Sequence, residues 1–222
     1  MVETLPVNTG TLMERLKLQM ALTSPLIATK GYVAPEVEQA CGRAVDLCQQ
    51  IGDSPYLFGV LGGLNSIYFN RCELDVALAL AKRMLERAEM TRDRISLLWA
   101  HYALGFTLAS QGKFRSARNH LERSVAFYDK RKSGTYGYVQ DPGPTAMAML
   151  ARLVHLLGYP DQAMRWLQQS LALAEKVAHP FTSAWVLGFS LVALGIMAAT
   201  VVIPLTRTPA MGWMETRSVH GF

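Results

Sequence analysis

Hydrophobic residues recur at helical spacing along most of the chain, most clearly from Leu98 to Lys130. Two helical patterns meet there at Gln111-Gly112, and in the second the apolar residues share one face while the charged residues fall elsewhere. Small residues, Gly105 and Ala117, stand where two antiparallel helices must approach closely. Gly112 suits the turn because glycine adopts positive φ at low cost. The pattern predicts a helix–turn–helix hairpin that stacks on copies of itself.

The markers of this hairpin recur along the chain. A shift of 46 residues downstream keeps every spacing and gives Leu150-Ala151, Gly158, Ala163, Leu167 and Ser170. A shift of 40 residues upstream gives a weaker echo, Leu64-Asn65, Cys72, Ala77, Ala81 and Met84, with Cys72 in place of the turn glycine. A further 37 residues upstream the markers are Ala28, Pro35, Ala40, Ala44 and Leu47. Recurrence on this scale resembles the tetratricopeptide repeat, whose period is about 34 residues, so the extra residues should lengthen helices or loops.

The predicted fold is all-α, a right-handed superhelix of tetratricopeptide-like antiparallel helix hairpins without a sheet. About eight helices are expected over residues 11–180. The predicted domains are a repeat domain, 1–180, with hairpins at about 11–51, 56–92, 94–128 and 144–177, and an apolar helix with an irregular tail, 181–222. Pro25 should kink or interrupt the first helix because proline lacks a backbone donor. The stretch Asp129 to Pro144 should be a long loop, since glycine and proline disfavour a helix interior.

Four strings carry a more specific resemblance. They are ATKGYVAPEVEQA (28–40), YVQDPGP (138–144), LLGYPDQA (156–163) and LAEKVAHPF (173–181). Over roughly residues 2–187 the chain resembles the tetratricopeptide tail of large bacterial regulators, in which a class III adenylate/guanylate cyclase domain and an AAA-type predicted ATPase domain precede the repeats. The resemblance implies an interior piece of such a tail. No catalytic residue carries over, and the sequence has no G-x-x-x-x-G-K-[ST] phosphate loop.

The sequence departs from that family near its end. Ala184 to Leu205 is a run of 22 residues without charge, and about 20 suffice to cross a bilayer. Three interpretations stay open: a membrane-crossing helix, a helix packed on the last hairpin, and a sequence diverged by frameshift or truncation. We expect Phe181 to about Leu194 to continue as a helix against Trp166 and Leu173, and residues 207–222 to be poorly ordered. An apolar terminal helix on a solenoid could also drive self-association.

Composition adds little to the choice of partner. The net charge of +5 comes from 22 basic and 17 acidic residues dispersed along the helices, and Lys130-Arg131-Lys132 is interpreted as complementing a helix C-terminus. No nucleic-acid partner is predicted. Three cysteines without paired spacing, and no secretory signal, lead us to expect a cytoplasmic protein, or alternatively one attached to a membrane through its apolar segment. Cys41 and Cys48 are interpreted as small buried side chains, because no further metal ligands converge on them.

The sequence offers no catalytic constellation. The five histidines, at 101, 120, 155, 179 and 220, are scattered, and no Ser-His-Asp, Cys-His or paired-carboxylate arrangement can be defended. We therefore predict no enzyme activity, no cofactor and no metal.

The predicted function is a non-catalytic, regulatory repeat module that binds a protein or peptide. Candidate contacts lie on the concave face formed by the first helices of the hairpins: Leu61, Asn65, Tyr68, His101, Leu108, Met147 and His155. The long loop adds four candidates, Tyr136, Tyr138, Gln140 and Asp141, because loops of this length are uncommon unless they are used. The alternative is a sensor solenoid that closes around a small ligand. The enclosure of the groove discriminates between the two, since small-ligand sites bury most of the ligand.

Overall fold

The computed structural model describes residues 9–51, 56–130 and 140–207, with only the backbone described from 196 onward. This part of the chain contains nine α-helices and no strand: α1 (Thr9–Lys30), α2 (Pro35–Ile51), α3 (Leu57–Asn70), α4 (Leu74–Thr91), α5 (Arg94–Ser110), α6 (Phe114–Phe127), α7 (Pro142–Leu156), α8 (Pro160–Val177) and α9 (Pro180–Arg207). The predicted all-α fold of paired helices is confirmed.

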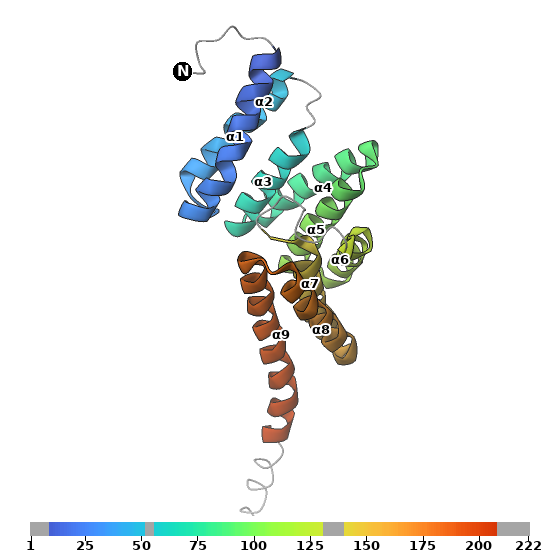
Figure 1. Cartoon of the computed structure of the whole chain (residues 1–222). Helices are drawn as coiled ribbons and strands as arrows, with labels where there is room; N and C mark the ends of the chain where they lie inside the picture. Colours follow the sequence, from blue (N-terminus) through green and yellow to red (C-terminus); the bar gives the residue numbers. More distant parts are fainter. Residues whose placement is uncertain (1–8, 52–55, 131–139, 208–222) are drawn as a thin grey trace, which may run out of the picture.

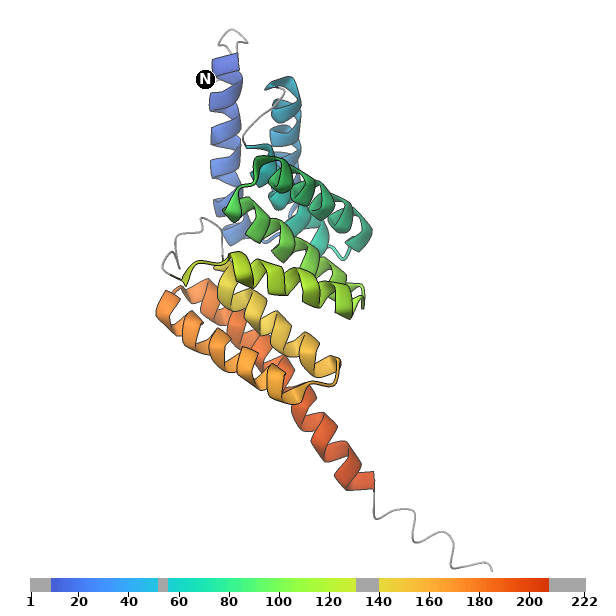
Figure 2. The same cartoon turned by 90° about the vertical axis from the view of Figure 1, so that its right-hand side faces the viewer.

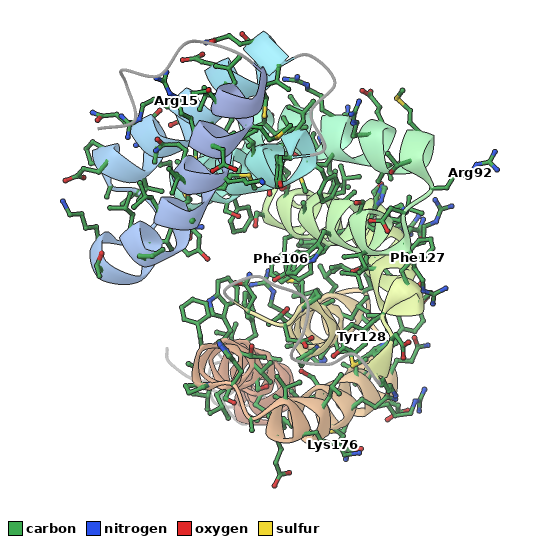
Figure 3. The ribbon with its side chains drawn as sticks, turned by 45° about the horizontal axis from the view of Figure 1, so that its top comes forward. Arg15, Arg92, Phe106, Phe127, Tyr128 and Lys176 are labelled. Carbon is green, nitrogen blue, oxygen red and sulfur yellow. The ribbon has the colours of Figure 1, made fainter. Side chains whose placement is uncertain are left out.

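The helices form a stack of antiparallel hairpins. Each odd-numbered helix from α1 to α7 packs on the even-numbered helix that follows it, and α3, α5, α7 and α9 join the hairpins to one another. The α1–α2 hairpin lies at one end of the stack and α9 at the other (Figure 1), and α9 projects beyond the last hairpin (Figure 2). Seen from above, the stack bends into an arc, with Phe106 towards the inner side and Arg92 on the outer side (Figure 3).

The turn between the two helices of each hairpin contains one residue with positive φ. These residues are Gly31 (82°), Cys72 (62°), Gly112 (74°) and Gly158 (91°). At Gly112 the turn N–H donates to the carbonyl of Ala109 (3.1 Å), and the next N–H, of Lys113, donates to the carbonyl of Leu108 (2.9 Å). The same pair of hydrogen bonds recurs around Cys72 and Gly158. Such paired bonds satisfy carbonyls at a helix C-terminus, so Cys72 occupies the glycine position that the sequence markers assigned to it.

The first hairpin is offset from the second by 40 residues, so the predicted offset of 37 is wrong. The buried residues of α2 are Val37, Ala40, Cys41, Ala44 and Cys48, and those of α4 are Ala77, Leu80, Ala81, Met84 and Ala88. Each α4 position is 40 residues after its α2 counterpart. The sequence markers of the first hairpin differ from this structural alignment by three residues, almost one helical turn. Both alignments therefore place alanines on the buried face. The turn residue with positive φ is Gly31, 41 residues before Cys72, and Pro35 opens α2.

Small and polar residues let the helices of a hairpin approach closely. A Cβ atom added at Gly105 in α5 would lie 2.5 Å from Leu121 Cγ in α6. The equivalent residue in α3, Asn65, donates from Nδ2 to the carbonyl of Ala77 (2.8 Å). Ser124 in α6 donates to the carbonyl of Leu98 (3.1 Å), as Ser170 in α8 donates to the carbonyl of Pro144 (2.7 Å). The repeat thus preserves contacts as well as residue types.

Two helix boundaries differ from those predicted. Pro25 lies inside a continuous α1, and the carbonyl of Ala21, which loses its donor there, belongs to an exposed residue that water can reach. Helix α7 begins at Pro142, inside the predicted loop, because proline is tolerated in the first turn of a helix. The Asp141 carboxylate caps this helix by accepting a hydrogen bond from the N–H of Gly143 (3.0 Å).

Helix α9 continues from the last hairpin and packs on both α7 and α8. Its Trp185 and Phe189 lie against the main hydrophobic core, whereas Leu187, Leu191, Val192 and Leu194 are exposed. Among the described residues, no helix is both long and apolar enough to cross a bilayer. The membrane-crossing helix, one of the three interpretations of residues 184–205, thus finds no support among the described residues. Residues 208–222, most of the tail predicted to be poorly ordered, lie outside the described residues.

Candidate functional site

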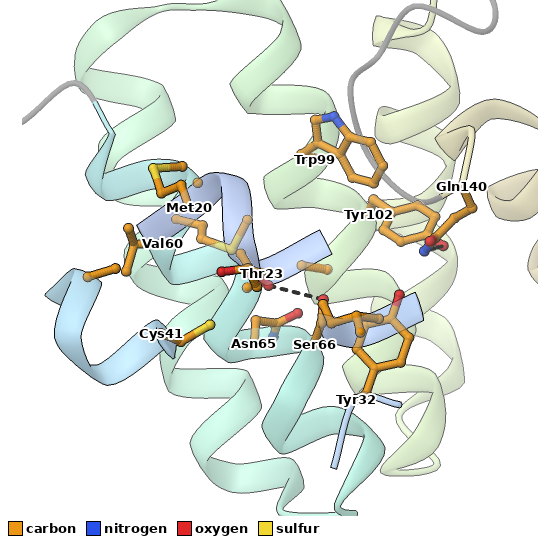
Figure 4. Close-up of a pocket in the computed structure, with 17 residues that line it drawn as sticks. Met20, Thr23, Tyr32, Cys41, Val60, Asn65, Ser66, Trp99, Tyr102 and Gln140 are labelled. Atoms are coloured by element: carbon orange, nitrogen blue, oxygen red, sulfur yellow. Dashed lines mark hydrogen bonds between the residues drawn. The ribbon is translucent and has the colours of Figure 1, made fainter. Parts of the chain in front are cut away.

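A cavity of about 340 Å³ lies on the inner side of the arc. Its walls come mainly from α1, α2, α3 and α5, with Gln140 from the segment before α7 (Figure 4). Figure 4 shows Met20 and Cys41 across the cavity from Trp99 and Tyr102. The first hairpin and the rest of the solenoid therefore enclose the cavity between them.

The cavity arises from a difference between two equivalent helices. Where α5 carries Trp99, Tyr102 and Phe106, α3 carries Gly59, Gly62 and Ser66, each 40 residues earlier. All six positions lie on the inner side of their helices and line this cavity or the smaller recess beside it. Met20 of α1 packs beside Gly59, where an added Cβ would lie 2.8 Å from its Cε, and the small residues Gly62 and Ser66 leave space beyond it. The large rings of α5 form the opposite wall.

Polar groups are spaced along the largely apolar wall. Ser66 Oγ donates to the carbonyl of Gly62 in its own helix (3.0 Å), and Gln140 Nε2 lies 3.4 Å from the Tyr102 hydroxyl as its donor. Burial raises the pKa of Tyr102 to about 12, against the opposing effect of its hydrogen bonds with Thr145 and Gln140. Burial also raises the pKa of Tyr32 above its ordinary value of 10.0. Both phenols are therefore neutral near pH 7.

The described residues that line the cavity include no Asp, Glu, Lys, Arg or His. Cys41, the one thiol among them, is also neutral near pH 7, because burial raises its pKa more than a hydrogen bond with Thr23 lowers it. A cavity without charge or a nucleophilic pair can bind an apolar group and orient it through hydrogen bonds, but it provides no acid–base pair for catalysis.

A smaller recess of about 40 Å³ extends the cavity towards Phe69, Phe106 and Trp185. The two hollows share six residues of their walls: Tyr32, Asn65, Ser66, Tyr102, Ala103 and Gln140. Aromatic rings continue the apolar surface from α5 to α9, with centroid distances of 4.4 Å for Tyr102–Phe106 and 6.2 Å for Phe106–Trp185. The inner side of the arc is therefore apolar and aromatic from the cavity to α9.

Three of the predicted groove residues are buried and do not line the cavity. Leu61, His101 and Met147 occupy equivalent positions on α3, α5 and α7, and each is at most 3% exposed. His101 Nδ1 lies 2.9 Å from His120 Nδ1 on α6, and its ring stacks on Phe127 with a centroid distance of 5.9 Å. The structure thus places His101 in the contact between α5 and α6.

The electrostatic environment keeps this histidine pair neutral near pH 7. Burial, helped by His120 and Arg123, lowers the pKa of His101 to about 4. Burial and Arg123 also lower the pKa of His120 below its ordinary value of 6.5. With both rings neutral, one Nδ1 donates its proton to the other, which accepts it.

The remaining predicted residues are divided among several places. Asn65 lines the cavity, Leu108 belongs to the main core, and Tyr68 is half-buried with its hydroxyl 3.5 Å from Glu38 Oε1. His155 is half-buried near the end of α7. Of the loop candidates, Gln140 lines the cavity. Asp141 caps α7, and its N–H donates to Thr182 Oγ1 (2.9 Å) in α9. Tyr136 and Tyr138 lie outside the described residues.

Sequence reasoning missed most of the cavity wall, including Tyr32, Ser66, Trp99 and Tyr102. Helix α5 is buried around its whole circumference from Leu98 to Ala109, so its hydrophobic pattern does not identify the inner face. The usable signal was the 40-residue repeat itself. Aligning α3 with α5 at this offset would have shown that small residues of α3 correspond to aromatic residues of α5.

Comparison with known proteins identifies the repeats. A family model described as "Tetratricopeptide repeat" matches residues 56–130, and a second model of the same description matches residues 145–180. No curated protein matches the chain significantly. The first match spans α3 to α6, including two walls of the cavity, and the second covers most of α7 and all of α8. The chain therefore contains tetratricopeptide repeats.

Proposed function

We propose that the chain is a non-catalytic tetratricopeptide module that binds a segment of a protein partner on the inner side of its arc. Tetratricopeptide repeats generally mediate protein–protein interaction. The observation that supports this site is the uncharged cavity, which opens onto an aromatic surface on the same side of the solenoid. Aromatic side chains in a concave site provide apolar contact area at low cost in side-chain entropy.

The volume of the cavity favours a second candidate, a small-ligand sensor. Small-molecule sites commonly measure about 300–1,000 Å³, and the cavity lies near the lower limit at about 340 Å³. The aromatic surface beyond the cavity favours the peptide, because a small ligand that fits the cavity would leave it unused. Protein binding is therefore the first candidate.

The resemblance to cyclase- and ATPase-containing regulators supports a finer proposal. The module would be regulatory and would bind such a regulator or one of its partners. The exposed apolar residues of α9, Leu187, Leu191 and Val192, also allow self-association. Sedimentation of the full chain at increasing concentration tests self-association: a constant monomer mass would contradict it.

Selection of peptides tests the main proposal. The full chain is used to select binders from a random peptide library displayed on phage, and the selected peptides are synthesised. We expect micromolar Kd values by fluorescence anisotropy, and slower amide hydrogen exchange in α3 and α5 when a peptide is bound. Failure to select any binding peptide, or protection confined to the outer helices α4, α6 and α8, would contradict the proposal.

A further inference from the structure

The walls of the cavity define what it can bind. Its polar atoms are hydroxyl, amide and thiol groups, and none of its described lining residues carries a charge. Ser66 and Asn65 already donate hydrogen bonds to backbone carbonyls, whereas Tyr102 and Gln140 meet each other only at 3.4 Å. This long, weak contact leaves the Gln140 amide able to bond to a neutral polar atom of a ligand. Tyr102 also has a hydrogen bond with Thr145, and its hydroxyl oxygen keeps acceptor capacity for the same ligand atom.

The described lining residues offer no charge that would compensate a charge in the ligand. A carboxylate or ammonium group that leaves water for an apolar site loses its hydration, and it needs a paired charge to recover that loss. Tyr32 and Tyr102 are neutral phenols near pH 7, since burial raises pKa values that already lie near 10.0, so neither supplies an anion that could pair with a cation. The described lining residues therefore disfavour a ligand charge of either sign.

The size of the cavity suits a group of one or two rings, because an apolar cavity of about 150 Å³ already holds benzene. A volume of about 340 Å³ equals the liquid volume of roughly ten water molecules. The rings of Trp99 and Tyr102, whose centroids are 5.3 Å apart, form one wall. Aromatic groups pack favourably against such rings in edge-to-face or offset geometry.

We infer that the cavity between α1, α3 and α5 binds one uncharged aromatic or large aliphatic group, with a neutral hydrogen-bonding atom directed to Tyr102 and Gln140. This inference deepens the proposed function. It rests on that function only where the bound group is a side chain of a protein partner. The group is a side chain of the bound protein segment or, under the second candidate function, part of a free small molecule.

Three small probes that share a phenyl ring test the chemistry. Phenylacetamide is neutral, phenylacetate is an anion and phenethylamine is a cation at pH 7. Each is titrated into the full chain and followed by NMR chemical shifts. We expect phenylacetamide to bind with a Kd on the order of 1 mM, as the size of the probe allows. We expect the two charged probes to bind at least tenfold more weakly. Equal binding of all three would overturn the inference.

A matched pair of variants tests the location. Ser66→Leu fills the cavity at a residue whose equivalent in α5 is Phe106, and Ser116→Leu makes the same change on an exposed part of α6. Ser66→Leu should weaken phenylacetamide binding at least tenfold, and Ser116→Leu should leave it unchanged. If Ser66→Leu loses its helical circular dichroism, Ala103→Leu replaces it, because Ala103 also lines the cavity. Undiminished binding to a folded cavity-filling variant would refute the site.

The selected peptides distinguish the two sources. Replacing the anchoring aromatic or aliphatic residue of a peptide by Asp should weaken binding at least tenfold. If the probes bind but no peptide is selected, the inference stands with a small molecule as the source, and the proposed protein-binding function fails. If peptides bind through acidic or basic anchors on the inner face, the proposed function stands and the inference fails.

Discussion

Adding a single methyl group at Gly105 tests the helix contact on which the third hairpin depends. A Cβ atom at this position would lie 2.5 Å from Leu121 Cγ, 2.7 Å from its Cδ2 and 3.3 Å from its backbone nitrogen. Leu121 is 0% exposed, so its side chain cannot move into solvent. The Gly105→Ala variant must therefore move α5 and α6 apart or distort Leu121.

The expected change combines two opposing effects. Overpacking a well-packed core typically costs about 1–3 kcal/mol, whereas replacing glycine by alanine within a helix gains about 1 kcal/mol. Gly105→Ala should therefore lower the free energy of unfolding by about 0–2 kcal/mol. Gly42→Ala in α2 is the matched control, because no atom lies within 4 Å of its added Cβ, and it should gain about 1 kcal/mol. The difference between the variants, about 1–3 kcal/mol, isolates the steric effect.

Urea denaturation, followed by far-ultraviolet circular dichroism, measures this difference. Both variants and the parent chain should be compared at one protein concentration, because the exposed face of α9 allows self-association. If Gly105→Ala proves as stable as Gly42→Ala, then α5 and α6 do not approach each other as closely as the structure shows.

Four further predictions concern stability. The pKa of His101 is depressed on folding, so the unfolded chain binds a proton near pH 6.5 that the folded chain does not bind until about pH 4. Stability should be full above pH 6.5 and fall by at most about 3.4 kcal/mol as the pH drops through this range, and thermal melts of His101→Phe should show a weaker pH dependence. Cys72→Gly should raise the free energy of unfolding in urea by about 1 kcal/mol, because φ is 62° at this position. Cys72→Ala should leave it unchanged. Asp141→Ala should cost about 1 kcal/mol through loss of the α7 cap, and Asp141→Asn should restore most of it in the same assay. Ala117→Leu should cost about 1–3 kcal/mol, since Ala117 is fully buried, and an unchanged melting temperature would show that the assigned hairpin contact is wrong.

Most of the fold followed from the spacing of small residues and turn residues. Gly112 and Gly158 are reliable markers because the turn requires positive φ, which most other residues avoid. The same reasoning recognised Cys72 at a turn despite its side chain. It placed the first hairpin itself correctly but shifted its repeat markers by three residues, because Val37 takes the place of the small alanine and no marker distinguishes two registers one helical turn apart.

The site was harder to predict because its residues show no local pattern. Asn65 and Gln140 were identified, since one lies on a first helix and the other in the long connection. Tyr102 and Trp99 were not, because every residue around them in α5 is buried and the inner face has no distinctive periodicity. His101 was chosen as a polar residue on a first helix, but it pairs with His120 across the hairpin. A cavity forms where the side chains of facing helices together fail to fill the space between them. The residue types of one helix alone do not reveal this.

The position of the cavity also governs how the first hairpin is held. The main core runs from α3 to α9, whereas two smaller clusters, around Leu16 and around Val37, attach α1 and α2 to α3. Local opening of a protein follows the elements with the fewest buried contacts, so α1 and α2 should undock before the rest of the solenoid unfolds. A ligand in the cavity touches both sides of that junction. At a concentration 100 times its Kd, such a ligand stabilises the docked state by about 2.7 kcal/mol if it binds that state alone. Occupancy of the cavity and docking of the first hairpin are thus linked equilibria. A partner that binds only the docked hairpin would therefore bind more tightly when the cavity is occupied.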